Sequence, residues 1–143
     1  MKTKILFFCT GNSCRSRMAE GWARHLKHDR IEAASAGVWT HGLNPLAVKV
    51  MAEVGVAISS QHSKTTDELA GREFDYVITV CSHADENCPF FRAKTRVLHH
   101  GFDDPPKLAL EAATDEEAPL HYRRVRDEIR TFVKKLPESI VTD

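Results

Sequence analysis

The stretch "FFCTGNSCRSRMAEGW", Phe7–Trp22, decides the fold and the chemistry that the sequence predicts. An apolar strand ends at Cys9, and a loop of small polar residues follows it. A helix is predicted from Arg15, because apolar side chains then recur every four residues, at Met18, Trp22 and Leu26. The sequence therefore predicts a strand, a short loop and a helix, with a cysteine at one end of the loop and an arginine at the other.

A loop of this kind is suited to binding an oxyanion. Its backbone N–H groups can point inward as an anion-binding nest, and the helix dipole adds partial positive charge. Gly11 and Asn12 tolerate the unusual backbone angles that the turn requires. The planar guanidinium of Arg15 matches a tetrahedral oxyanion. We therefore expect the substrate-binding residues to be Thr10, Gly11, Asn12, Ser13, Cys14 and Ser16.

Cys9 is the predicted nucleophile of this loop. The positive field that binds an oxyanion also lowers the pKa of a cysteine thiol, and Ser16 is placed to hydrogen-bond the sulfur. The alternative is a small buried thiol beside a surface arginine. The spacing C-x5-R alone arises by chance, but C-x5-R-S between a strand and an amphipathic helix is much more specific. We therefore expect Cys9 to attack an oxyanion that Arg15 holds.

The remaining chain predicts an α/β fold. Further strands are expected in "RIEAASAG" up to Gly37, in Phe74–Val80 and in "TRVLHH", and helices alternate with them. This order predicts a three-layer sandwich with a central four-stranded parallel sheet. The length of 143 residues fits one domain, residues 1–143. The segment 107–119 is ambiguous between a short helix with a loop and a mobile excursion.

Two helices carry clear sequence signals. The first has Asn44 as its N-cap, Pro45 in its first position and Gly55 just past its end. Leu46, Val50 and Val54 are predicted to line its inner face. The last helix has one apolar stripe, made of Tyr122, Val125, Ile129, Phe132, Val133 and Leu136.

Three reactive side chains should meet at one edge of this sheet. Cys9 and Cys81 each follow a predicted strand, and Asp104 lies a few residues past another. Ligands of parallel sheets bind beyond the carboxyl ends of the strands. The topology therefore predicts that these three residues converge.

The charge balance argues against several partners. There are 20 Lys and Arg residues against 20 Asp and Glu residues, so no basic excess favours nucleic acid or an anionic membrane. No apolar run approaches a transmembrane helix, and the first apolar run is too short for a signal peptide. We expect a cytoplasmic protein, with a monomer as the default.

Four cysteines point to redox or nucleophilic chemistry. They are Cys9, Cys14, Cys81 and Cys88. In a reducing compartment they are not expected to form permanent disulfides. Their C-x4-C and C-x6-C spacings differ from common zinc motifs, so we expect no metal, although nearby histidines leave zinc as an alternative. A thiol pair that becomes a disulfide supplies two electrons, and a third thiol can take that disulfide over.

The loop resembles that of the low-molecular-weight tyrosine phosphatase family. That family has an N-terminal C-x5-R-S loop and a late Asp-Pro pair whose aspartate is the general acid. The matching pair here is Asp104-Pro105, and Asp103 is a rival that does not precede a proline. Both aspartates can also be simple turn-forming residues.

Five motifs narrow the resemblance. "CTGNSCRSRMAEGW", "SAG", "THGLNP", "CSHADENCP" and "GFDDP" together resemble thioredoxin-coupled arsenate reductases, which share the phosphatase fold. The resemblance implies that Cys9 attacks arsenate and that Asp104 protonates the departing oxygen. It also implies that Cys81 then attacks Cys9, that Cys88 attacks Cys81, and that thioredoxin reduces the final disulfide. Cys14 is interpreted as structural, and no organic or metal cofactor is implied.

One position departs from that family. Some members bind potassium through an asparagine, a glutamate, a serine and an aspartate. Asn12, Glu20 and Ser35 match the first three, but Lys64 takes the place of the aspartate. We predict that the Lys64 ammonium replaces the ion, although a solvated surface lysine is the alternative.

Two other functions compete with arsenate reduction. A tyrosine phosphatase would leave Cys81 and Cys88 unexplained, and Pro106 stands where an aromatic residue is expected; weak phosphatase side activity remains compatible with the loop. A non-catalytic thiol sensor would explain the cysteines but not Arg15 and the nest.

Overall fold

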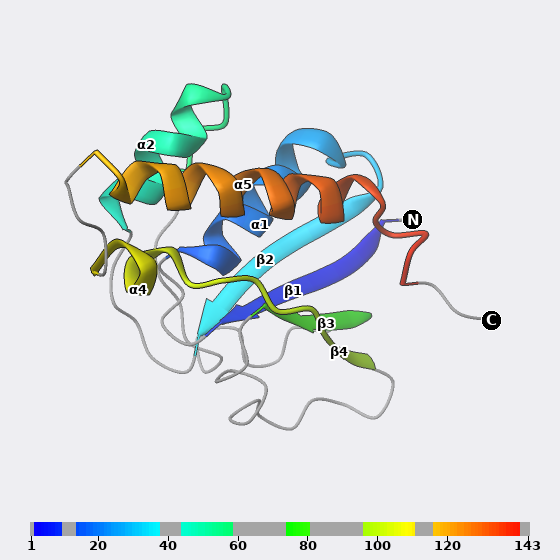
Figure 1. The fold of residues 1–143 in the computed structure, drawn as a ribbon. Coiled ribbons are helices and arrows are strands. Elements are labelled where there is room, and N and C mark those ends of the chain that lie inside the picture. The colour runs from blue at the N-terminus through cyan, green and yellow to red at the C-terminus, as the bar shows by residue number, and fades with distance from the viewer. Residues whose placement is uncertain are drawn as a thin grey trace.

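A four-stranded parallel sheet forms the centre of the computed structural model (Figure 1). The structure describes residues 2–9, 14–37, 44–58, 74–80, 96–110 and 116–140. The strands are β1 (Thr3–Cys9), β2 (Ile31–Gly37), β3 (Tyr76–Thr79) and β4 (Arg96–His99), in the order β2-β1-β3-β4. The predicted α/β class and four-stranded parallel sheet are confirmed, and β3 and β4 are shorter than the predicted strands.

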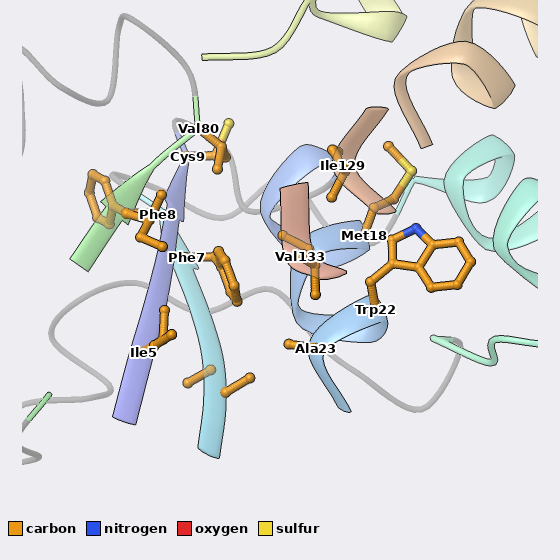
Figure 2. Close-up of a cluster of buried hydrophobic side chains, with 14 of the residues drawn as sticks. Ile5, Phe7, Phe8, Cys9, Met18, Trp22, Ala23, Val80, Ile129 and Val133 are labelled. Atoms are coloured by element: carbon orange, nitrogen blue, oxygen red, sulfur yellow. The ribbon is translucent and has the colours of Figure 1, made fainter. Parts of the chain in front are cut away.

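β1 lies inside the sheet because it is apolar on both faces. Its residues Ile5–Phe8 are all 0% exposed, as expected for an interior parallel strand. Phe7 points toward the helices α1 and α5, and Phe8 points to the other side of the sheet (Figure 2). Because side chains alternate along a strand, Cys9 shares the side of Phe7.

The register aligns the carboxyl ends of the strands at one edge. Cys9 pairs with Gly37 of β2, and Phe8 pairs with Thr79 of β3. Beyond the strand ends, backbone N–H groups continue the pairing: Val80 donates to Phe8, and Phe102 donates to Val80, at 2.9 and 3.0 Å. The chain after β4 is thereby carried to the edge where β1 ends.

Two long helices cover one face of the sheet. α1 (Arg15–Leu26) packs on β1 and β2, and α5 (Ala118–Lys134) packs beside α1. Ile129 and Val133 of α5 meet Phe7 in a shared core with α1 (Figure 2). The indole N–H of Trp22 donates to the backbone oxygen of Arg126 at 3.1 Å, which ties α1 to α5.

α2 (Pro45–Glu53) packs against α5 and α1 and begins as predicted. The Asn44 side chain accepts hydrogen bonds from the N–H groups of Leu46 and Ala47, and Gly55 adopts a positive φ of 81°. Its predicted inner face is partly wrong. The buried residues are Ala47, Val50 and Met51, whereas Leu46 is half-buried and Val54 is 37% exposed. Residues eight apart differ by about 80° around a helix axis, and the helix ends before Val54.

The last part of the chain holds two helices. α4 (Pro105–Leu110) packs against α5, which settles the start of the ambiguous segment 107–119; residues 111–115 lie outside the described part. The predicted stripe of α5 is confirmed at Tyr122, Val125, Ile129 and Val133, which are buried. Phe132 is half-buried, and Leu136 is buried just past the end of the helix. None of the helices that the structure describes is long and apolar enough to cross a membrane.

Candidate active site

Cys9 is the last residue of β1 and sits at the edge where the strands end. It is buried, with 5% of its surface exposed. Its strand lies between β2 and β3, and its side chain faces the side of the sheet that α1 covers. This position confirms that the predicted strand delivers Cys9 to the carboxyl edge.

Arg15, the first residue of α1, points back to the segment that follows β4. One terminal nitrogen, Nη1, donates to the backbone oxygen of Phe102 at 3.0 Å, and the other, Nη2, lies 3.6 Å from Oδ1 of Asp104. The Arg15 side chain is 11% exposed. Its Nε is buried and has no hydrogen-bond partner among the described residues. The guanidinium is therefore oriented by Phe102 and Asp104, and its Nε–H is a donor that a ligand can use.

Asp104 and Asp103 face different partners. Asp104 pairs with Arg15, is 40% exposed, and its backbone oxygen accepts the N–H of Leu108 in the first turn of α4. Asp103 instead accepts a hydrogen bond from Nη2 of Arg124 in α5 at 2.9 Å. The geometry thus brings Asp104, the aspartate before the proline, to the arginine of the loop and keeps its rival in a separate ion pair.

Cys14 lies in an environment that keeps its thiol protonated. Burial strongly raises the pKa of the Cys14 thiol, and the neighbouring Arg15 only partly counteracts this. Its backbone oxygen accepts the N–H of Met18 at 2.9 Å, in the first turn of α1. Ser16 is completely buried in the same turn. This environment agrees with the structural role expected for Cys14, while the hydrogen bond from Ser16 to the Cys9 sulfur stays a prediction.

Several predicted site residues lie outside the described part of the chain. They are Thr10, Gly11, Asn12, Ser13, Cys81, Cys88 and Lys64. Val80, the residue before Cys81, is described, and its N–H donates a hydrogen bond to the backbone oxygen of Phe8, the residue before Cys9. The structure pairs Asp104 with Arg15 and carries Phe102 to the edge where the strands end, while the convergence of Cys9, Cys81 and Asp104 stays a prediction.

A buried carboxylate of α1 has a partner that was not predicted from the sequence. Glu20, 1% exposed, accepts a hydrogen bond from Oγ of Ser35 at 2.6 Å. Its second oxygen lies 3.0 Å from Nε of Arg24. The signal was present, because Glu20 and Arg24 stand four residues apart on one helix. Arg24 thus balances the negative charge of Glu20.

Two further residues near Asp104 were not predicted as site residues. The hydroxyl oxygen of Tyr122 accepts a hydrogen bond from the side-chain amide of Asn44 at 3.0 Å, and burial raises the pKa of Tyr122. Arg124 holds Asp103, as described above. The sequence did hold a signal for Tyr122: it is the one residue of the predicted apolar face of α5 that carries a hydroxyl group, and buried tyrosines usually find a hydrogen-bond partner. Within the residues that the structure describes, no group of three or more His, Cys, Asp or Glu side chains could hold a metal ion.

Comparison with known proteins places this geometry in a family. Residues 4–143 match the model of the low molecular weight phosphotyrosine protein phosphatases. An arsenate reductase of Halalkalibacterium halodurans is 46% identical over 140 residues, which cover 97% of this chain and 99% of that protein.

Solved structures agree with that match. An arsenate reductase in the phosphate binding state superposes with a TM-score of 0.73 at 30% identity, covering 99% of this chain and 100% of that one. The thioredoxin-dependent arsenate reductase of Corynebacterium glutamicum gives a TM-score of 0.70 at 26% identity, over 97% of this chain and 61% of that one. The chain therefore belongs to the low molecular weight phosphotyrosine protein phosphatase family, in which these similar proteins are arsenate reductases.

Proposed function

We propose that this protein reduces arsenate to arsenite with electrons from thioredoxin. The observation that supports the proposal is the Arg15–Asp104 pair, in a chain whose β1 ends at Cys9 and that is 46% identical to an arsenate reductase. The pairing with Asp104 and the bond to Phe102 orient the guanidinium of Arg15, whose Nε remains available to an oxyanion.

The first step is nucleophilic attack on arsenic. The Cys9 thiolate forms a bond to arsenic of an arsenate held by Arg15 and the amides of loop 10–14, and Asp104 protonates the oxygen that leaves as water. Asp104 is placed for this role because its carboxylate lies 3.6 Å from Arg15, the side chain proposed to hold the arsenate. The product is a covalent arseno-cysteine.

The second step transfers two electrons to arsenic. The Cys81 thiolate attacks the sulfur of Cys9, the sulfur–arsenic bond breaks with its electron pair on arsenic, and arsenite leaves. A Cys9–Cys81 disulfide remains. Cys88 then attacks Cys81, which frees Cys9 and leaves a Cys81–Cys88 disulfide for the dithiol of thioredoxin to reduce. The Corynebacterium glutamicum neighbour, a thioredoxin-dependent arsenate reductase, supports this electron donor.

The direct test is arsenite production with thioredoxin, thioredoxin reductase and NADPH. Arsenite formation should match NADPH oxidation one to one and should require thioredoxin. A protein that consumes no NADPH and makes no arsenite under these conditions would contradict the proposed function.

Phosphate-ester hydrolysis is the second candidate, as a weak side activity. It is favoured by the family match over residues 4–143 and by the structural neighbour in a phosphate binding state. Hydrolysis of p-nitrophenyl phosphate that persists after Cys81→Ala and disappears after Cys9→Ser would establish it, because a phosphatase needs only the first thiol.

A further inference from the structure

The segment 101–104, just before α4, determines where Arg15 and Asp104 lie. Phe102 supplies the backbone oxygen that binds Nη1 of Arg15, and Asp104 supplies the carboxylate near Nη2. A shift of this segment would therefore move both groups together. What holds the segment 101–104 in place thus bears directly on the proposed chemistry.

One side of this segment lacks close-packed support. Gly101 and Phe102 border a hollow of about 780 Å³, which Phe132 and Glu128 of α5 also line. On the side of the hollow, the Phe102 ring packs against two other aromatic rings. Its centre lies 4.8 Å from the centre of the His100 ring and 5.8 Å from the centre of the Phe132 ring. Aromatic contacts fix the position of Phe102 on the side of the hollow, but they do not reach Asp103.

Asp103 is held by α5 through charge. Nη2 of Arg124 donates to Oδ2 of Asp103 at 2.9 Å, while Nη1 of the same guanidinium donates to Oε2 of Glu128 at 2.9 Å. Glu128 lies one turn further along α5, so it fixes the direction of the Arg124 side chain. The guanidinium therefore reaches Asp103 from a fixed position on a long helix that packs on the core.

The exposure of this ion pair argues against a role in stability. The side chains of Arg124 and Asp103 are 43% and 64% exposed, and exposed pairs contribute little to folding. The pair nevertheless lies next to Asp104 in the chain and connects it to α5. A contact with little effect on stability but with a fixed place beside a reacting group is suited to positioning that group.

We propose that Arg124 is a positioning residue for the reduction of arsenate: by holding Asp103 it sets Asp104 and the Phe102 oxygen against Arg15. This rests on the proposed function, in which Asp104 protonates the departing oxygen. The side chain of Arg124 binds Glu128 and Asp103 and not the reacting groups themselves. It therefore acts on Asp104 through the backbone between Asp103 and Asp104.

The test compares Arg124→Gln with Arg123→Gln. Arg123 is a matched control on the same helix, because it makes a bidentate pair with Glu53 of α2, at 2.9 and 2.8 Å, away from the segment 101–104. The measurement is the rate of arsenite formation in a single turnover without thioredoxin, at a series of arsenate concentrations. This rate reports the chemistry on arsenic and is independent of the final reduction step.

Arg124→Gln should lower the maximal rate about fivefold, since small displacements of a reacting group have large effects on rate. The arsenate concentration for half-maximal rate should change less than the rate, because the loop amides and Arg15 still hold the oxyanion. Arg124→Lys should restore part of the rate, and the melting temperatures of both Arg124 variants should match that of the wild type. Arg123→Gln should react at the wild-type rate.

A double-mutant cycle identifies the path of the effect. If Arg124 acts through Asp103, then Arg124→Gln should have no further effect on the rate in an Asp103→Asn background. An equal rate for Arg124→Gln and wild type, additive effects in the cycle, or a rate loss accompanied by a lower melting temperature would each overturn the positioning role. If wild type and Arg123→Gln form no arsenite at all, the proposed function fails instead, so the two failures are distinguishable.

Discussion

Two cysteines five residues apart illustrate how environment assigns chemistry to identical side chains. Cys9 ends a strand at the open edge of the sheet, whereas burial raises the pKa of the Cys14 thiol and keeps it protonated. Arg15 directly follows Cys14 and is oriented by Phe102 and Asp104. Both cysteines are 5% exposed, so the proposed nucleophile is distinguished by the C-x5-R-S spacing and by its place at the end of β1, and not by exposure.

The first prediction concerns the nucleophile and the arginine. Cys9→Ser should abolish arsenite formation with the fold intact, because a serine hydroxyl is neither a thiolate nor a redox partner. Arg15→Lys should reduce the rate by about 100-fold or more, because a point charge cannot make the planar, two-pronged contact of a guanidinium. Arsenite assays together with circular dichroism would measure both effects, and normal reduction by Cys9→Ser would exclude the mechanism.

The second prediction separates Cys88 from Cys81. Cys88→Ala should form one arsenite per enzyme and then stop, because Cys88 only carries the disulfide outward. Mass spectrometry after alkylation and digestion should find a Cys9–Cys81 disulfide in the stalled protein. Cys81→Ala should release no stoichiometric arsenite by the internal route. If Cys88→Ala instead turns over normally with thioredoxin, the third thiol is dispensable and the relay is wrong.

At the scale of elements, α1 connects the site to the core. Its first residue is Arg15, and its later residues contact the sheet, α2 and α5. Gly21 lies where α1 faces α2: a Cβ atom built there would stand 2.7 Å from Cγ2 of Ile58 and 3.3 Å from both Met51 and Val56. The close approach of these elements therefore depends on a missing side chain.

The third prediction follows from this close approach. Alanine is favoured over glycine in a helix by about 1 kcal/mol. The clash of a new methyl group with a packed core costs about 1–3 kcal/mol, so Gly21→Ala should lower the free energy of unfolding by up to about 2 kcal/mol. Urea unfolding would measure the loss, with an alanine substitution at the exposed Lys49 of α2 as a control for a helix position without such contacts. A more stable Gly21→Ala protein would show that the core relaxes around the methyl group.

The fourth prediction concerns potassium, which some members of the family bind through residues that match Glu20 of α1 and Ser35 of β2. Ser35 and Arg24 already satisfy both oxygens of Glu20, and Lys64 is expected to complete the replacement of a potassium ion. Added potassium should change neither the melting temperature nor the turnover relative to the same concentration of sodium. A selective increase with potassium would contradict this. Lys64→Asp should create sensitivity to potassium.

At the scale of the whole molecule, charged pairs connect helices that are distant in sequence. Glu53 at the end of α2 accepts hydrogen bonds from both Arg123 and Arg126 of α5. The hydrogen bond from Arg123 is the main reason that the pKa of Glu53 falls from 4.5 to about 2. This carboxylate is exposed, so salt should weaken its contribution.

The fifth prediction is the pH dependence that results. A carboxyl group with a depressed pKa stabilises the fold above its unfolded pKa, and this contribution is lost as the pH falls from about 4.5 toward about 2. Glu53→Gln should therefore show a smaller loss of thermal stability across this range than the wild type, and the difference should shrink at high salt. Identical pH profiles for the two proteins would show that the pair does not contribute to acid stability.

The sequence predicted what depends on local pattern and on topology. Strand–loop–helix order placed Cys9, and the Asp-Pro pair selected Asp104 over Asp103, as the contact with Arg15 now supports. The sequence could not show that Arg124 holds Asp103 or that Gly21 is needed for packing, because these depend on distances between elements. Val54 was misplaced because the helix ends one residue earlier.

The strand order has a consequence for the newly made chain. β1 carries Cys9 and is synthesised early, yet one of its two neighbours in the sheet, β3, begins only at Tyr76. Until the ribosome has released that later strand, β1 has an open edge and its thiol has no finished sheet around it. Domains generally fold as units, so the proposed nucleophile passes through a period in which its own fold does not yet shield its thiol.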